Sequence, residues 1–274
     1  MDILKLPFVQ GAIRMAYEGY TRGWHERNGG NLTYRLRPEE AEAAAPGFSP
    51  RGWEEIGTQV PSLAGEYFLT SGTGKYMGNL LIAPEETLGI IEIDGTGERY
   101  RVVWGLTGGR PTSELPSHLM NHEVKKRASG GAHRVIYHSH PANVVALTFA
   151  LPLDDKTFTR ALWSTMTECP IIFPGGVGVV PWMVPGGRDI AVATSRLMEE
   201  FDVAIWAYHG LFCSGADFDL TFGLMDTVEK AAEIVIKVLS TGSKLEGITS
   251  DNLRAIARDF HLTLPERFLD PVGE

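Results

Sequence analysis

Apolar residues near the start of the chain recur every three to four positions, as they do on the buried face of an amphipathic helix. Between Phe8 and Tyr20 this pattern predicts a helix that ends near Gly23. The same periodicity predicts further helices over 116–128, 143–151, 190–201 and 221–239, and a last helix with Ser250 as its N-cap.

Shorter apolar runs predict strands, because a strand needs few residues and alternates its side chains between two faces. The run 32–36 alternates apolar and polar residues, so one of its faces is expected in water. Residues 88–94 and 100–104 flank Asp94-Gly95, a dipeptide typical of hairpin turns. The other predicted strands cover 67–70, 134–138, 171–173, 177–180 and 203–208.

These helices and strands follow one another without strict alternation. The order predicts an α/β protein of the α+β type, with a central, largely antiparallel sheet flanked by helices. Because no repeat or linker divides the chain, we expect residues 1–274 to form a single domain. Residues 38–61 are rich in Glu, Ala, Pro and Gly, and we expect them to be a surface insertion and the least ordered internal stretch.

Composition narrows the classes of partner. The 274 residues are 43% hydrophobic and carry a net charge of −9, and no basic cluster is longer than 125–127, so nucleic acid is not an expected partner. No apolar run approaches the roughly 18 residues of a membrane span, and the N-terminus lacks signal-peptide features. Cys169 and Cys213 form no C-x-x-C pair. We therefore expect a cytoplasmic protein with no membrane partner.

Three histidines are candidate metal ligands. His138 and His140 stand at the end of the predicted strand 134–138, and side chains two positions apart on a strand point to the same side. Alone, this pair is explained equally well as two hydrogen-bonded surface histidines. His209 follows the apolar run 203–208 and is placed to be a third ligand. Three neutral nitrogens with an open position are typical of a catalytic zinc site.

Other polar residues leave more than one explanation open. His118 and His122 have metal-ligand spacing on the helix 116–128, but a solvated face or a supporting position is favoured. Glu114 could be a general acid and base, although a glutamate at a helix start more often serves capping. The glycine-bearing loops 71–75 and 28–31 could bind an anion through backbone amides, although each alone is more simply a turn.

Together and in this order, these features resemble the class II aldolase family, which includes fuculose-phosphate aldolase and ribulose-phosphate 4-epimerase. The resemblance runs from Phe8 to about Leu239, and it does not extend to the 38–61 insertion or to a divergent tail at 242–274. It rests on GWHERNGGNLT at 23–33, WGLT at 104–107, PTSELP at 111–116, TEC at 167–169, FP at 173–174, PWMVPG at 181–186, HG at 209–210 and TFGL at 221–224.

The resemblance implies a helix-flanked, largely antiparallel sheet in a cyclic homotetramer with active sites at subunit interfaces. By position, His138, His140 and His209 resemble the ligands of one Zn²⁺ per subunit, and Glu114 resembles the catalytic acid and base. Glu168 resembles a carboxylate that reaches the site of a neighbouring subunit. The implied phosphate-binding and substrate-binding residues are Asn28, Gly30, Asn31, Thr73, Gly74 and Ser113.

The implied reaction is reversible cleavage of a phosphorylated ketose, L-rhamnulose 1-phosphate, to dihydroxyacetone phosphate and L-lactaldehyde. A related aldolase or epimerase acting on fuculose or ribulose phosphate with the same zinc site is the alternative. A binding protein without metal, like the adducin-type relatives, is disfavoured because all three histidines and Glu114 are present.

Overall fold

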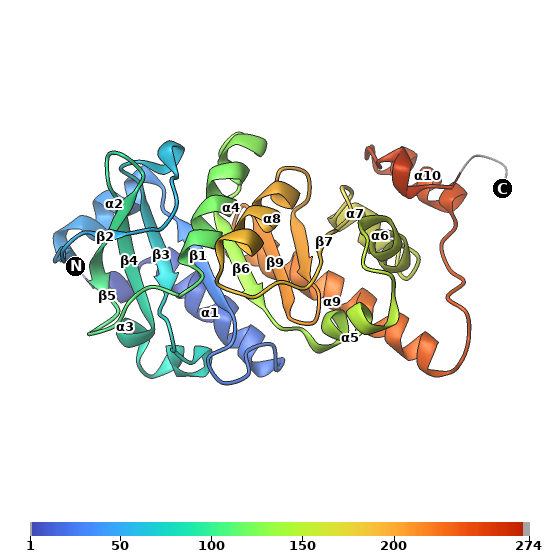
Figure 1. Cartoon of the computed structure of the whole chain (residues 1–274), viewed down its shortest axis with the longest axis horizontal. Helices are drawn as coiled ribbons and strands as arrows, with labels where there is room; N and C mark the ends of the chain where they lie inside the picture. Colours follow the sequence, from blue (N-terminus) through green and yellow to red (C-terminus); the bar gives the residue numbers. More distant parts are fainter. Residues whose placement is uncertain (1, 271–274) are drawn as a thin grey trace.

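Nine strands form one continuous sheet in the computed structural model, which describes residues 2–270 (Figure 1). The order is β2-β5-β4-β3-β1-β6-β9-β8-β7, and every neighbouring pair is antiparallel except β7 and β8. The predicted, largely antiparallel sheet is therefore confirmed. The strands are β1 (Asn31–Arg35), β2 (Glu54–Glu55), β3 (Tyr67–Ser71), β4 (Leu88–Ile93), β5 (Arg99–Gly105), β6 (Val135–Ser139), β7 (Gly178–Val180), β8 (Val203–Trp206) and β9 (Gly210–Gly215).

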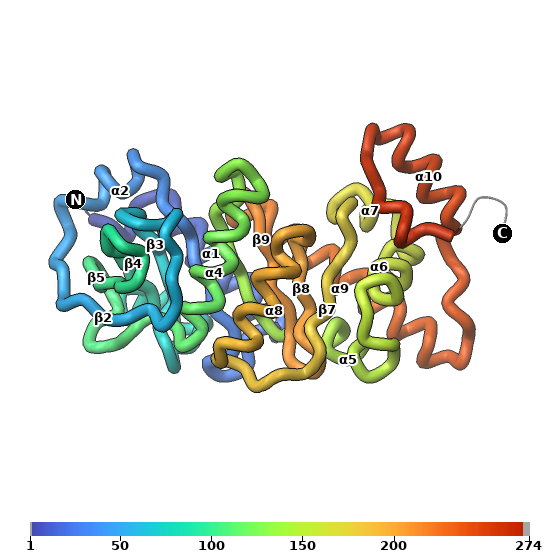
Figure 2. The backbone as a smooth tube through the Cα atoms, turned by 45° about the horizontal axis from the view of Figure 1, so that its top comes forward, coloured from blue at the N-terminus to red at the C-terminus, as the bar shows by residue number. Residues whose placement is uncertain are grey.

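Helices cover both faces of this sheet. Helices α4 and α8 pack together on one face, and α1, α5 and α9 pack on the other (Figure 2). The helices are α1 (Pro7–Thr21), α2 (Pro38–Ala44), α3 (Pro84–Thr87), α4 (Leu115–Ala128), α5 (Ala142–Ala150), α6 (Asp155–Trp163), α7 (Glu168–Ile172), α8 (Arg188–Met198), α9 (Phe218–Ser240) and α10 (Ser250–Asp259). Short 3₁₀ helices cover Ile3–Lys5, Ala45–Gly47, Pro61–Leu63, Met77–Leu81 and Glu266–Phe268.

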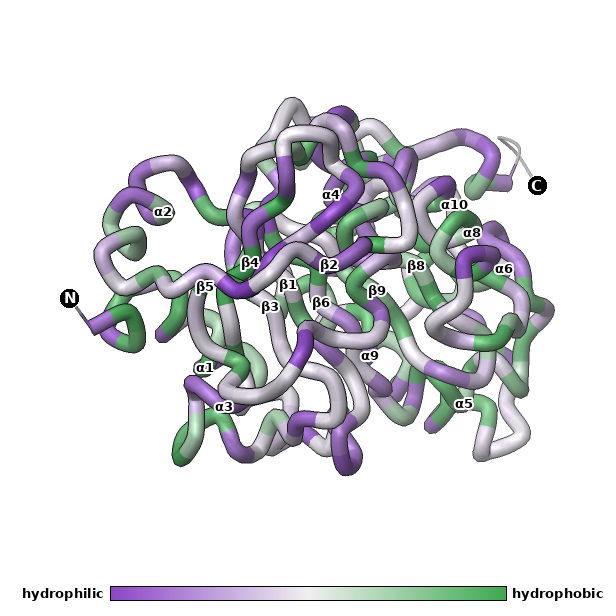
Figure 3. The backbone as a smooth tube through the Cα atoms, turned by 60° about the vertical axis from the view of Figure 1, so that its left-hand side comes forward, coloured by the Kyte–Doolittle hydropathy of each residue, from purple (hydrophilic) through white to green (hydrophobic). Residues whose placement is uncertain are grey.

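The alternation of side chains along β1 and β6 separates two kinds of interior. Leu32, Tyr34 and Tyr137 join the large apolar core under α1 and α9. Figure 3 shows hydrophobic residues along the central strands, and hydrophilic residues concentrated in the outer loops and helices. The residues that alternate with Leu32, Tyr34 and Tyr137 along β1 and β6, such as Thr33 and Ile136, point to the opposite face, toward α4. On the α4 face, polar side chains such as Thr33 and His118 are therefore buried together with apolar ones.

Helix α4 begins at a position that matters for the site. Pro116 stands at the start of the helix, where its missing N–H costs no hydrogen bond. Lys125, Lys126 and Arg127 occupy the last turn, where positive charge suits the helix dipole. Pro116 favours a helix start directly before it, and Glu114 is then the N-cap residue, beside the ends of β1 and β6.

Most predicted elements are confirmed, and the differences have physical reasons. The polar face of β1 is not in water, because α4 covers it and all five of its residues are buried. Residues 171–173 were expected to be a strand, but 171 and 172 end helix α7. The central strand β9 was not predicted, because its apolar run covers only residues 211–213, between Gly210 and Ser214. The last helix is capped by Thr249, one residue before the predicted Ser250.

The stretch 38–61 is more regular than the sequence indicated. It contains helix α2 and strand β2, and β2 pairs with β5 at the edge of the sheet. Ala44, Ile56 and Val60 are buried, so parts of this stretch belong to the core. The expectation that it is the least ordered internal segment is wrong. No helix between residues 2 and 270 has the length and apolar character needed to cross a membrane.

Candidate metal centre and active site

Three imidazole rings meet at one end of the central strands. His138 lies in β6, His140 follows that strand, and His209 stands in the turn between β8 and β9. One nitrogen from each ring lies within 4.8 Å of the other two. The Nε2 atom of His138 is 3.3 Å from Nε2 of His140 and 3.4 Å from Nε2 of His209. The three histidines singled out from the sequence therefore converge on one point.

The hydrogen-bond partners of Nδ1 in His138 and His140 determine which ring nitrogen carries the proton. Nδ1 of His138 lies 3.0 Å from the Leu211 carbonyl oxygen, and Nδ1 of His140 lies 2.7 Å from a Glu26 carboxylate oxygen. Those oxygens only accept, so each Nδ1 donates its proton and each Nε2 holds a lone pair. Burial lowers the pKa of His138 well below its usual value and that of His209 to about 4.

Neutral lone pairs that face one another repel unless a cation lies between them. Two nitrogens bound to a tetrahedral zinc, each at about 2.0–2.1 Å, lie roughly 3.3 Å apart. The separations of 3.3 and 3.4 Å between the Nε2 atoms match this spacing. The hydrogen bonds that orient the outer nitrogens are those of a typical histidine metal site. Two of the three nitrogen pairs therefore have the spacing of zinc ligands, and the cluster fits a bound metal ion.

Packing fixes the rings in this geometry. Phe212 of β9 stacks on His138, with ring centroids 4.2 Å apart and an interplanar angle of 13°. Tyr208, in the turn before His209, has a φ of +62°, which is uncommon outside glycine. Its amide donates a 3.0 Å hydrogen bond to the Thr148 hydroxyl of α5, which holds the turn in place. The turn directs His209 back toward β6.

Glu114 lies beside the histidines. One of its carboxylate oxygens is 3.7 Å from Nε2 of His138, and it accepts a 2.9 Å hydrogen bond from the side-chain amide of Asn31. Asn31 pairs with His138 across β1 and β6, so the fold holds these groups together. Burial raises the pKa of Glu114, and the Asn31 hydrogen bond acts in the opposite direction. A buried carboxylate at this place suits proton transfer.

The glycine-bearing loops border this region. An isolated bridge between Gly72 and Pro111 joins the loop 71–75 to the segment that precedes α4. Thr73 and Ser113 line one pocket of about 310 Å³. Gly30 and Gly74 have φ values of +73° and +68°, which only glycine adopts readily. Asn28, Thr73, Gly74 and Ser113 are exposed, so their polar groups are open to a ligand.

Two predicted residues have surroundings that differ from the rest. Asn31 is buried, and both ends of its amide are hydrogen-bonded, to Glu114 and to His118. Glu168 is exposed at the start of α7, which packs with α9 and α10. Among residues 2–270, neither a hydrogen bond nor an ion pair connects Glu168 with the three histidines. Within one chain, Glu168 is therefore not part of the cluster.

The sequence did not single out Glu26 as a supporting residue, and for His118 and His122 it left both a solvated face and a supporting position open. Glu26 orients His140, although its place in the motif at 23–33 was visible. His118 and His122 are fully buried against β1, so a solvated face for this pair is wrong. The polar residues that alternate along β1 could have indicated this burial, because they contact the two histidines of helix α4.

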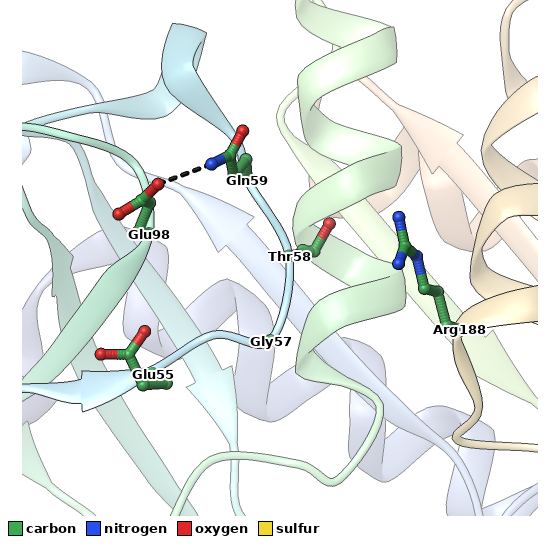
Figure 4. A pocket seen from close by; sticks show the side chains of 6 residues that line it. All are labelled: Glu55, Gly57, Thr58, Gln59, Glu98 and Arg188. Atoms are coloured by element: carbon green, nitrogen blue, oxygen red, sulfur yellow. Dashed lines mark hydrogen bonds between the residues drawn. The ribbon is translucent and has the colours of Figure 1, made fainter.

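A wide polar pocket of about 590 Å³ lies elsewhere on the chain, and Figure 4 shows its lining side chains. Gln59 donates a 2.6 Å hydrogen bond to Glu98 on one side of it, and Arg188 of α8 stands on the other. None of the residues that line it belongs to the histidine cluster or to the glycine-bearing loops.

Comparison with known proteins places this geometry in a family. The family model described as "Class II Aldolase and Adducin N-terminal domain" matches residues 11–236. The rhamnulose-1-phosphate aldolase of Mannheimia succiniciproducens is 45% identical over 265 residues, which cover 96% of this chain and 97% of that protein.

Solved structures agree with this match. A sugar-phosphate aldolase from Thermotoga maritima superposes with a TM-score of 0.72 at 29% identity, covering 85% of this chain and 95% of its own. An L-fuculose 1-phosphate aldolase has the same fold, with a TM-score of 0.61 at 18% identity, covering 92% of this chain and 95% of its own. The match over most of the chain, together with 45% identity to a relative of similar length, shows that the chain belongs to the class II aldolase and adducin family.

Proposed function

We propose that the chain is a zinc-dependent aldehyde-lyase that reversibly cleaves L-rhamnulose 1-phosphate to dihydroxyacetone phosphate and L-lactaldehyde. The observation that carries this proposal is the position of the buried Glu114 carboxylate, 3.7 Å from a ring of a three-histidine cluster. Lewis-acid and proton-transfer groups side by side are what an aldol cleavage needs. The 45% identity to a rhamnulose-1-phosphate aldolase over almost the whole chain supports the substrate.

His138, His140 and His209 would hold the zinc ion. When bound, zinc supplies a Lewis acid beside the carbonyl and adjacent hydroxyl oxygens of the ketose. Cleavage breaks the C3–C4 bond, leaves its electron pair on the phosphorylated fragment as an enediolate, and removes a proton from the C4 hydroxyl. Glu114 donates a proton to C3 of that fragment in cleavage and takes it back in synthesis. Burial of Glu114 favours the protonated form that cleavage requires.

The loops would hold the phosphate at the other end of the substrate. The exposed hydroxyls of Thr73 and Ser113 suit a dianion, and Gly74 lets the chain turn close to it. Asn28 and Gly30 belong to the neighbouring turn. Binding energy from the phosphate then positions the reacting carbons, which do not themselves contact these loops.

The alternative substrates are fuculose and ribulose phosphates. The L-fuculose 1-phosphate aldolase resembles this chain at 18% identity, a likeness that supports only a common fold. The 45% identity to a rhamnulose-1-phosphate aldolase favours the rhamnulose substrate instead.

Glu168 is proposed to act in the site of a neighbouring subunit of a homotetramer, on the proton of the hydroxyl that becomes the aldehyde. Its exposure leaves it available to a second chain. The test is sedimentation of the purified protein together with mixing of Glu168→Gln and Glu114→Gln subunits. Partial recovery of activity in the mixed oligomers would support a shared site, and its absence would contradict it.

A single domain and a cytoplasmic location stay predictions.

The direct test of function is release of dihydroxyacetone phosphate from L-rhamnulose 1-phosphate. It would be measured on native protein, on protein stripped of metal by a chelator, and on stripped protein with zinc returned. Activity that is lost with the metal and returns with zinc is expected. No cleavage by fully zinc-loaded protein would overturn the substrate and direct the search to fuculose and ribulose phosphates.

A further inference from the structure

A row of buried polar side chains runs from the catalytic end of β1 into the protein. Asn31 and Thr33 lie two positions apart on β1 and face helix α4. His118 and His122, one turn apart on α4, face them. His118, His122 and Thr33 are each no more than 1% exposed. Burying polar groups without partners is costly, so four such groups in one row call for an explanation.

The chemistry of each group fixes the direction of the hydrogen bonds. The Glu114 oxygen that faces Asn31 accepts a hydrogen bond, so Asn31 presents its NH₂ group to it, at 2.9 Å. The Asn31 carbonyl oxygen therefore faces Nε2 of His118, which must donate to it. Burial lowers the pKa of His118 to about 3, so its ring is neutral and carries only this one proton.

The remaining links follow from that proton. Nδ1 of His118 is an acceptor, and the Thr33 hydroxyl donates to it at 2.8 Å. The Thr33 oxygen then accepts from Nε2 of His122 at 2.9 Å. The hydrogen bonds of this row thus all point the same way, from His122 through Thr33, His118 and Asn31 to the Glu114 carboxylate. Reversing any one link would place two acceptors or two donors face to face.

We propose that His118 is a positioning residue for catalysis: through Asn31 it directs an N–H donor at Glu114 and so holds the carboxylate in place beside the histidine cluster. The inference rests on the proposed function, because it assigns Glu114 the proton-transfer role. His118 is fully buried, and within residues 2–270 its ring nitrogens lie against Asn31 and Thr33 and not against the three histidines. Thr33 and His122 fix the ring nitrogen on which His118 carries its proton.

The arrangement is not what packing alone would select. Phe68 and Phe212 lie against the His122 and His118 rings, with centroids 5.0 and 5.3 Å away, so apolar residues would fit these surroundings. Replacing buried polar networks by apolar groups is often neutral for stability. The polar row ends in the catalytic carboxylate, and without His118 the Asn31 amide is free to turn its carbonyl toward Glu114. That rotation would replace an attraction with a repulsion.

The test compares His118→Leu, which removes the donor, with His118→Gln, whose amide can still donate to Asn31. Val124→Ala is the control for lost packing in α4, because Val124 is buried on the same helix and outside the row. Four quantities would be measured: kcat and KM for cleavage, bound zinc, and the rate of exchange of the C3 proton of dihydroxyacetone phosphate in D₂O, followed by NMR. The exchange reports proton transfer by Glu114 without C–C cleavage.

For His118→Leu we expect kcat and the exchange rate to fall on the order of 10- to 100-fold, with KM and zinc content little changed. His118→Gln should recover most of both rates, and Val124→Ala should lower only the melting temperature. Wild-type rates in His118→Leu, or equal losses in the Leu and Gln variants, would overturn the inference. Absence of cleavage and exchange in the wild-type protein would instead overturn the proposed function.

Discussion

His138 and Thr73 belong to two halves of the candidate site that are held in different ways. His138 is 1% exposed, donates to a backbone carbonyl of β9 and stacks on Phe212. Thr73 is exposed on a loop, and its backbone amide donates to the Arg110 carbonyl oxygen. The histidine half is therefore held by β6, β9 and the turns at their ends. The loop half presents polar groups to solvent from glycine-bearing turns.

This difference suits the two tasks proposed for the halves. A metal ion needs ligands within a few tenths of an ångström of their positions, and strands supply that precision. A phosphate group is large and accepts hydrogen bonds from many directions, so loops that adjust to it are sufficient. Substitutions in the histidine half should therefore remove turnover, whereas substitutions in the loop half should mainly weaken substrate binding.

The largest effect is expected from His138→Ala. Removing the central ligand should abolish zinc binding and lower kcat/KM by at least about 1000-fold, which corresponds to about 4 kcal/mol. Bound zinc, measured by elemental analysis, and cleavage rate should fall together. His261→Asn, at an exposed histidine outside the cluster, is the control. Full activity in a His138→Ala protein that holds no metal would show that the cluster does not serve catalysis.

Glu114→Gln should keep the metal and lose the proton transfer. The side chain has the same shape, and its carbonyl oxygen can still accept from Asn31. We expect kcat to fall by on the order of 100-fold or more, with KM changed by less than about threefold and zinc content unchanged. Exchange of the C3 proton of dihydroxyacetone phosphate should fall equally. Exchange at the wild-type rate would assign the proton transfer to another group.

The sequence predicted the two halves unequally well. The i, i+2 spacing of His138 and His140 specifies one face of a strand, so their convergence followed from backbone geometry. His209 could be added because an apolar strand leads directly to it. The position of Glu114 beside His138 could not be derived in this way, because it depends on where α4 begins and which face of the sheet it covers.

The polar row on β1 shows where pattern reading failed. Alternation of Leu32, Thr33 and Tyr34 is the same whether the polar side meets water or a helix that carries histidines. Only the partner element decides, and His118 and His122 appear in the sequence more than 80 positions later. Similarly, β9 was missed because its burial comes from β6 and β8 on both sides, while its own glycines weaken the local signal.

A smaller effect is expected from a substitution of Glu26, which contacts the histidine half from the protein surface. Glu26 accepts from Nδ1 of His140 and is itself exposed. Glu26→Gln should keep a hydrogen bond but lose the negative charge, which weakens zinc binding by about 10-fold while kcat of the zinc-saturated protein changes little. Competition with a chromophoric chelator measures the affinity. Unchanged affinity would mean that packing alone orients the His140 ring.

The smallest effect is expected in the loop half, from Gly74→Ala. Gly74 has a φ of +68° with no atom within 4 Å of an added Cβ, so the only cost is backbone strain of roughly 1–2 kcal/mol. Gly242→Ala is a matched control, because Gly242 has a φ of +76° and equally open surroundings. Both variants should melt at similarly lowered temperatures. Only Gly74→Ala should raise KM for the phosphorylated substrate, by several-fold, because relaxation of the strain shifts the loop that is proposed to bind the phosphate. If the two variants had the same KM, the loop 71–75 would not bind the phosphate, and the contrast between an ordered metal half and an adaptable phosphate half would fail.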